Sequence, residues 1–435
     1  MKKLAAFVTI LSIAISSTII PCFASEEVVI SEETRDFWED VIDELDEDEY
    51  GGAYIKDGIL HIKPQDKVQT QSVLFDVAPN ARMASDIILD DEAKYTISEL
   101  KSAMKKANDL WETFNLNYVA LSEEYNGLLV GAYKWTEEQK EEFVKIIGIE
   151  NVIFDTVNAY EMEEKVETTQ KNQEENLERA FKQQLPGNLI YNDNVKENGV
   201  QQRSTLTACV LGDIDGYITT AHKGVENGHQ FKYDDETSKS QKILGTVSDR
   251  IVDGSRGVDA AIIKRDPSAI RSNVLRNEIT KKVGNQIFIE EPRRYLMTEE
   301  VAIEGDKVKI FGGQDIKAKE AYIQSTHCTK KWDTKDDYGD DMWYNIIMMT
   351  IVGDLYTTGG DSGSPVTIKL YDDKEEYGIV GVYKGADITA CGRSFYSDDM
   401  AGEEDICALA NEKRPFAFAS NWFNVKRAFG IDSIY

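Results

Sequence analysis

The sequence predicts an all-β domain from about residue 187 to the C-terminus, preceded by a small α+β unit. Beyond residue 187, short β-rich runs recur between Gly, Asp and Asn residues, which is typical of an antiparallel sandwich or barrel. Before it, segments with helical periodicity alternate with short strand-like runs. The β-rich runs are 207–211, 217–220, 242–247, 260–263, 307–311, 346–351, 365–370 and 378–383, and a C-terminal helix is expected over 421–429.

The first 24 residues have the pattern of a cleavable signal peptide. Two lysines precede an apolar run over 4–20, and a short cleavage-like segment follows at 22–24. A membrane anchor is the alternative, but the run is short for a span and polar residues begin at Ser25. We therefore expect removal of residues 1–24, secretion to the extracellular space and no membrane association afterwards.

Residues 25–186 are predicted to contain the α+β unit and a connector. The acidic start, up to about residue 49, is expected to be helical or partly disordered. Residues 160–184 are polar without a continuous apolar face, so we expect an exposed helical connector that Pro186-Gly187 ends. The elements expected between them are two strands around an Asp-Gly turn over 51–62, a helix over 96–114, a strand over 127–133 and a helix that starts after Thr136 with a Thr-x-x-Gln capping box.

Charge and cysteine content exclude several classes of function. The formal net charge is −29, or −31 once Lys2 and Lys3 leave with the signal, and such a chain repels nucleic acid and anionic lipid. No Cys-x-x-Cys occurs and the four histidines are scattered, so no metal or other cofactor is expected. Secretion permits disulfides, and four cysteines remain after the signal: Cys209, Cys328, Cys391 and Cys407. Three complete pairings are open, of which Cys391 with Cys407 closes the shortest loop.

Ser362 is the predicted nucleophile. It lies among glycines in the segment 357–366, where a tight turn exposes the hydroxyl. The backbone N–H groups of Gly360 and Ser362 are expected to form the oxyanion hole. Taken alone, the segment also fits a surface loop rich in Gly and Ser. The catalytic interpretation therefore needs a base and an acid elsewhere in the chain.

His222 and Asp259 are the predicted base and acid. His222 ends a half-buried strand at 216–222, and Asp259 directly precedes a buried one, where an unpaired acid is costly. The α/β-hydrolase elbow is excluded because Ser364 occupies its second glycine position and no histidine follows Ser362. The order His, Asp, Ser is instead the one found in chymotrypsin.

Residues 187–435 resemble the chymotrypsin-like (trypsin-fold) serine endopeptidases, especially their secreted bacterial branch. The matching motifs are residues 220–222, 258–261 and 360–365, and the segment 354–366 looks most like that of the glutamyl endopeptidases. The resemblance implies two antiparallel β-barrels, with His222 and Asp259 in the first and Ser362 in the second. Protein or peptide substrates would bind in the cleft between them.

The same resemblance implies a specificity pocket built from Tyr356, Thr357, Tyr383, Lys384 and Gly385. It predicts cleavage after Glu, with Asp or small polar residues as the second choice. If Tyr356 instead fills the pocket, only Ala or Ser fits.

Three positions depart from the pattern of the glutamyl endopeptidases or their relatives. Tyr383 replaces the pocket histidine, and Asp361 replaces an asparagine and points back to trypsin-like members. Lys223 stands where many relatives have the partner of Cys209.

The segment 25–186 is similar in layout to the pro-regions of alpha-lytic-type bacterial proteases. This implies a zymogen whose own pro-region assists folding and inhibits the enzyme until cleavage near Pro186-Gly187. The alternative is a catalytically silent binding protein or adhesin on the same fold. Such relatives usually lack a triad residue, whereas all three are present here.

Overall fold

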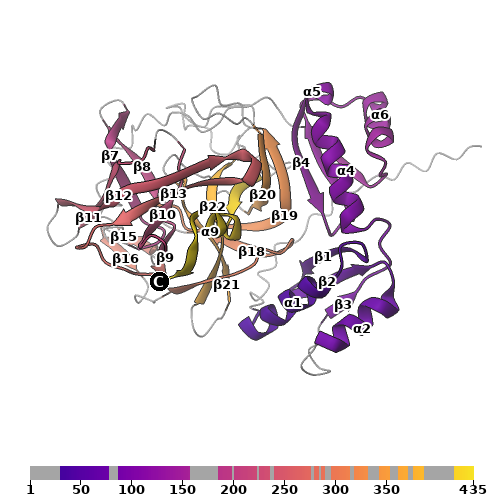
Figure 1. Cartoon of the computed structure of the whole chain (residues 1–435), viewed down its shortest axis with the longest axis horizontal. Helices are drawn as coiled ribbons and strands as arrows, with labels where there is room; N and C mark the ends of the chain where they lie inside the picture. The colour runs from indigo at the N-terminus through magenta and orange to yellow at the C-terminus, as the bar shows by residue number, and fades with distance from the viewer. Residues whose placement is uncertain are drawn as a thin grey trace, which may run out of the picture.

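The structure, a computed structural model, describes two bodies of secondary structure that pack side by side (Figure 1). The described residues are 30–77, 87–156, 185–197, 200–222, 225–235, 240–275, 279–283, 286–289, 295–313, 318–331, 342–352, 361–370, 376–386 and 416–435. The predicted signal peptide, the connector over 160–184 and the Cys391–Cys407 bridge lie outside them.

The N-terminal unit, residues 30–156, contains the same order of elements twice, a repeat that the sequence does not reveal. The first copy is α1 (Glu32–Glu44), β1 (Tyr50–Lys56), β2 (Ile59–Pro64), α2 (Lys67–Val77) and β3 (Ile87–Leu89). The second is α4 (Ile97–Asp109) with the one-turn α5 (Trp111–Phe114), β4 (Leu116–Ser122), β5 (Gly127–Ala132), α6 (Glu137–Ile147) and β6 (Val152–Thr156). In each copy the first two strands are antiparallel and the third is parallel to the second.

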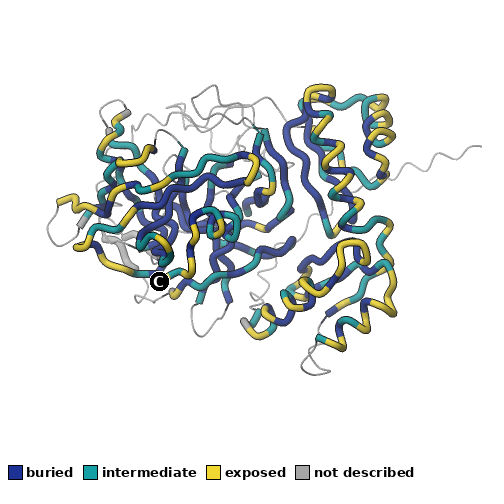
Figure 2. Tube along the Cα trace, in the orientation of Figure 1, coloured by how far each residue is buried: buried dark blue, intermediate teal, exposed yellow. Residues whose placement is uncertain are grey.

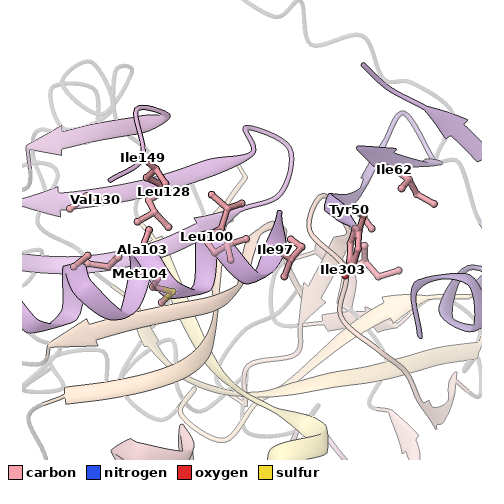
Figure 3. Packing of buried hydrophobic residues seen from close by; sticks show 14 of the residues in the cluster. Tyr50, Ile62, Ile97, Leu100, Ala103, Met104, Leu128, Val130, Ile149 and Ile303 are labelled. Carbon is pink, nitrogen blue, oxygen red and sulfur yellow. The ribbon is translucent and has the colours of Figure 1, made fainter. Parts of the chain in front are cut away.

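Local sequence signals account for most of these elements. Thr136 and Gln139 form the predicted capping box of α6, and Asp57 and Gly58 take the positive φ values, 53° and 76°, that their hairpin turn needs. The predicted 96–114 helix is present as α4 and α5. Figure 3 shows the packing of the unit's core, in which α4 faces β5 and Ile303 of the later domain lies beside Tyr50.

The first sheet of the C-terminal domain has eight strands in the order β24-β9-β10-β13-β12-β11-β7-β8. Every neighbouring pair in it is antiparallel. Its strands are β7 (Leu189–Glu197), β8 (Val200–Thr205), β9 (Ala208–Gly212), β10 (Gly216–Thr219), β11 (Gln230–Asp235), β12 (Ser240–Asp253), β13 (Val258–Arg265) and β24 (Ile431–Ile434).

The second sheet closes into a barrel through the ring β22-β21-β18-β19-β20-β23, all pairs being antiparallel. These strands are β18 (Lys307–Ile310), β19 (Lys319–Lys331), β20 (Met342–Ile351), β21 (Pro365–Lys369), β22 (Glu376–Ala386) and β23 (Phe416–Asn421). Four shorter strands accompany it. β14 (Val274–Leu275) and β17 (Tyr295–Glu299) extend the sheet beyond β22, and β15 (Ile279–Val283) with β16 (Gln286–Ile289) forms a separate hairpin.

The C-terminal helix α9 (Trp422–Phe429) joins the two sheets. Asn421 caps it, and Trp422, Val425 and Phe429 are buried in a cluster with strand residues from both sheets. Inward residues are buried along the strands, whereas the helices of the N-terminal unit expose their outer faces (Figure 2). The predicted fold class, an all-β domain of two antiparallel barrel-like sheets with a C-terminal helix behind a small α+β unit, is confirmed.

Both copies of the N-terminal repeat contact the C-terminal domain through their first strand. β4 pairs with the end of β19, so that Ala120 lies opposite Cys328 and one sheet runs through both units. In the other copy, the Ile55 amide of β1 donates to the Glu304 carbonyl at 2.7 Å. Open strand edges readily accept another strand, and here the C-terminal domain occupies both.

Two of the cysteines lie within the described part of the chain. Cys209 and Cys328 are buried thiols that are not joined to each other, and they lie in different sheets. Among the described residues, no helix is both long and apolar enough to cross a membrane.

Candidate active site

The pairing of β10 with β13 places His222 beside Asp259. The two strands are antiparallel with Thr219 opposite Ala261, so the chain leaving the end of β10 runs past the start of β13. His222 follows three residues after β10, and Asp259 is the second residue of β13. The two side chains therefore come from adjacent strands of one sheet, whose buried backbone fixes their positions.

Ser362 reaches the same point from the other sheet, just before β21. His222 Nδ1 lies 2.6 Å from Asp259 Oδ2, and His222 Nε2 lies 3.0 Å from Ser362 Oγ. Both distances are those of hydrogen bonds. The imidazole is thus placed between a carboxylate and a hydroxyl, the arrangement in which histidine can take the hydroxyl proton while the carboxylate stabilises the resulting charge.

Asp259 is fully buried and holds several donors. Its Oδ1 accepts from the Thr220 hydroxyl at 3.1 Å and from the amides of Ala221 and His222 at 3.0 Å each. Its Oδ2 accepts from His222 and from the Lys384 ammonium at 2.8 Å. Burial disfavours the carboxylate, but the charges and hydrogen bonds of His222 and Lys384 outweigh it and hold the Asp259 pKa well below its ordinary value.

The turn that carries Ser362 is fixed on both sheets. The Ser362 carbonyl accepts from the Thr205 amide at 2.9 Å in the first sheet, and the Gly363 amide donates to the Tyr383 carbonyl at 2.9 Å in the second. Gly363 has φ of +90°, and a Cβ there would lie 2.5 Å from the Thr205 carbonyl oxygen. Glycine is therefore required at 363 by both conformation and space.

Asp361, next to Ser362, forms a buried ion pair with Lys319 of β19. Oδ2 and Nζ are 2.5 Å apart, and the side chains are 0% and 1% exposed. In this structure a lysine of the second barrel is its partner.

Of the other predicted site residues, the structure describes Tyr383, Lys384 and Gly385. Gly360, Tyr356 and Thr357 lie outside the described residues. Tyr383 is fully buried in the apolar core of the second barrel, and Lys384 extends to Asp259. The pairing of β22 with β23 shifts register between Tyr383 and Gly385, so Lys384 lies at an irregular point of the strand. Gly385 lies on β22 opposite Phe418.

Sequence reasoning missed three residues that support the site. Lys319 partners Asp361, Trp343 stacks under Lys384, and the Ser420 hydroxyl accepts the Asp259 amide at 3.0 Å. Lys319 begins β19, a strand with several other polar residues and two further lysines, so the sequence does not single it out. No local pattern marks the other two. Over the described part of the chain, no cluster of His, Cys, Asp or Glu fits a metal ion.

Solved structures with a similar chain path include several bacterial serine proteases. A glutamic-acid-specific serine protease, reported to use a histidine triad in substrate binding, is 15% identical, with a TM-score of 0.35 over 58% of this chain and 100% of its own. Thermobifida fusca protease A is 16% identical, with a TM-score of 0.36 over 57% and 97%. The Nocardiopsis protease is 12% identical, with a TM-score of 0.37 over 57% and 97%.

No known protein family and no curated protein matches the sequence. Likeness to solved structures at this level of identity says nothing of activity or specificity. The chemistry of the site therefore has to be inferred from the contacts of His222, Asp259 and Ser362 themselves.

Proposed function

We propose that the chain is a secreted serine endopeptidase that acts through His222, Asp259 and Ser362. Ser362 Oγ attacks the peptide carbonyl carbon while His222 Nε2 takes its proton, and Asp259 stabilises the imidazolium. His222 then protonates the leaving amine, which leaves an acyl-enzyme on Ser362. Water then loses a proton to His222 and attacks that ester, and His222 returns the proton to Ser362 Oγ as the acyl group leaves. The amides of Gly360 and Ser362 are proposed to bind the oxyanion.

The observation that carries the proposal is the continuous chain of contacts from Asp259 through His222 to Ser362. Two short hydrogen bonds, 2.6 and 3.0 Å, join three residues that are 37 and 140 positions apart in the sequence. A structural histidine has no need of a half-buried serine hydroxyl on one nitrogen and a buried carboxylate on the other. A nucleophile and its base require both.

We propose further that the N-terminal unit is a pro-region and that the chain is a zymogen. Support comes from the strand pairing of β4 with β19 and from buried polar contacts across the boundary. The Arg35 guanidinium reaches Asp306 at 2.8 Å, and Lys330 Nζ reaches Asn117 Oδ1 at 2.7 Å. A unit that completes the edge of the second barrel can template its folding, and cleavage in the connector would release it.

For specificity we propose cleavage after Glu, with Asp or small polar residues second. The segment 356–359 has no carboxylate to receive Lys or Arg, and burying an unpaired cation is costly. The ion pair of Lys384 with Asp259 removes that cation from the groups available to an acidic side chain. The preference for Glu therefore rests on Thr357 and on the lack of a counter-charge for basic residues.

Hydrolysis by point variants tests the proposed mechanism. Ser362→Ala and His222→Ala should each lower kcat against a protein substrate by several orders of magnitude without lowering Tm. Ser255→Ala, which changes an exposed serine of the same domain, is the matched control and should keep full activity. Unchanged turnover in Ser362→Ala would contradict this mechanism, whereas a wild-type chain that hydrolyses no peptide would favour the catalytically silent binding protein.

A further inference from the structure

A buried lysine lies beside the proposed catalytic pair. Lys384 belongs to β22, and its side chain is 10% exposed. Its Nζ is 2.8 Å from Asp259 Oδ2 and 3.2 Å from the centre of the Trp343 ring. An ammonium held between a carboxylate and an aromatic face keeps its positive charge although it is largely removed from water.

Lys384 and His222 compete for the same oxygen. Asp259 Oδ2 accepts both the Lys384 ammonium and His222 Nδ1, the latter at 2.6 Å, while Oδ1 is occupied by one hydroxyl and two amides. When His222 takes the serine proton, one carboxylate therefore faces two cations. The charges of His222 and Lys384 lower the pKa of Asp259, and the charge of Asp259 opposes the burial that lowers the pKa of Lys384.

We propose that Lys384 is a positioning residue that acts on His222 through Asp259, sharing the carboxylate and making His222 a weaker base. The inference rests on the proposed function, in which His222 is the base that accepts the proton of Ser362.

The physical reason is that part of the Asp259 charge is already neutralised. An imidazolium gains stabilisation from an adjacent carboxylate and loses it to an adjacent ammonium, and both effects are strong where water is excluded. His222 consequently stays unprotonated, and able to act as a base, at a lower pH than it would beside Asp259 alone. The burial that lowers the pKa of Lys384 is opposed by the attraction of Asp259.

The test is the titration of His222, followed by NMR of the imidazole resonances in the full chain. The chain has four histidines, so His222→Gln identifies the resonance. Lys384→Met removes the charge at similar side-chain length and should raise the pKa of His222 by about one unit or more. Lys384→Arg keeps the charge and should leave it near the wild-type value. Lys264→Met, an exposed lysine of β13, controls for net charge and should leave it unchanged.

The acid limb of kcat/KM should move to higher pH in Lys384→Met by the same amount. An unchanged His222 titration in Lys384→Met overturns the inference. The inference also fails if Lys384→Met only raises KM for substrates with Glu before the cleaved bond, because Lys384 would then bind the substrate.

If Lys384→Met does not fold, Lys384→Gln, which also removes the charge, is titrated in its place. A His222 pKa above the wild-type value in that variant supports the inference, and an unchanged value contradicts it. These NMR readouts need no peptidase activity. A failure of the proposed function would appear separately, as a wild-type chain that does not hydrolyse peptides.

Discussion

Lys319 and Asp361 form a fully buried ion pair, and Asp361 directly precedes the proposed nucleophile Ser362. Lys319 lies on β19 of the second barrel, and Asp361 begins the turn that carries Ser362. The turn therefore takes its shape from a side chain that is already in place before any cleavage of the chain. Asp361 thus has an ion-pair partner that does not depend on a new amino terminus.

Breaking this ion pair should cost both stability and activity. Lys319→Met leaves the Asp361 carboxylate buried without its cation, which is expected to lower the free energy of unfolding by about 3–5 kcal/mol. The turn would also lose its anchor, so kcat should fall at least tenfold in the fraction that folds. Chemical denaturation and active-site titration measure the two effects.

The double variant Lys319→Met/Asp361→Leu is the control for buried charge. It removes both ions and should recover much of the lost stability but not the activity. Full activity in Lys319→Met would show that Asp361 does not need the lysine to hold the turn.

Processing should occur before residue 187. Pro186, Gly187 and Asn188 are buried, and the Gly187 amide donates to the Leu206 carbonyl at 2.7 Å. A cut between 189 and 205 would fall within or between β7 and β8, two paired strands of the first sheet. N-terminal sequencing of the secreted product should therefore find a start in the connector or at its end. A mature chain that begins beyond residue 190 would contradict this placement of the boundary.

The contact between the two units should weaken as pH rises. The Glu304 carboxylate accepts from the Ser122 hydroxyl at 2.8 Å and from the amides of Glu123 and Glu124 at 2.6 and 3.2 Å. Burial, then the nearby Glu123, raises the pKa of Glu304 to about 8, and burial raises the pKa of Glu123 to about 7. At these pH values both carboxyl groups hold a proton in the folded chain, and they release it when the chain unfolds. Their contribution to stability is therefore full below their ordinary pKa and is lost as pH rises through 7 to 8.

Chemical denaturation of the full chain between pH 6.5 and 9 measures this loss, which should reach about 2 kcal/mol. His327, whose pKa burial lowers to about 4, affects stability only below its ordinary value of 6.5. Glu123→Gln should flatten the profile, whereas Glu124→Gln, at a carboxylate that is 44% exposed, should not. A wild-type stability that rises over this range would mean that the two acids are ionised in the assembled chain.

Primary specificity is tested by digestion of a peptide library with the mature enzyme. Cleavage should occur mainly after Glu, then after Asp or small polar residues, because the pocket segment offers hydroxyls and no carboxylate. Cleavage after Ala alone would mean that Tyr356 fills the pocket. Dominant cleavage after Lys or Arg would contradict both interpretations.

The sequence predicted the elements whose signals are local. Thr136 with Gln139 marked a helix start, Asp57-Gly58 marked a hairpin, and the strand-end settings of His222 and Asp259 marked two residues of the proposed site. The repeat in the N-terminal unit and the pairing of β4 with β19 were not predictable, because strand partners distant in sequence leave no local pattern.

The direction of the Lys384 side chain could not be predicted from the sequence either. Its position in the chain suggested a side chain facing substrate. In the structure Lys384 lies at a register shift of β22, and its ammonium donates to Asp259 of the first sheet. A side chain's partner depends on which sheet packs against it, and that is a property of the whole fold.

The central claim is that Ser362 is an activated nucleophile. The most direct measurement is labelling of the intact chain and of the processed chain with a fluorophosphonate, followed by mass spectrometry of the modified peptide. We expect one phosphonylated residue, Ser362, with labelling abolished in His222→Ala and retained in Ser255→Ala. Labelling that is absent in both the intact and the processed chain, or that persists in Ser362→Ala, would contradict it.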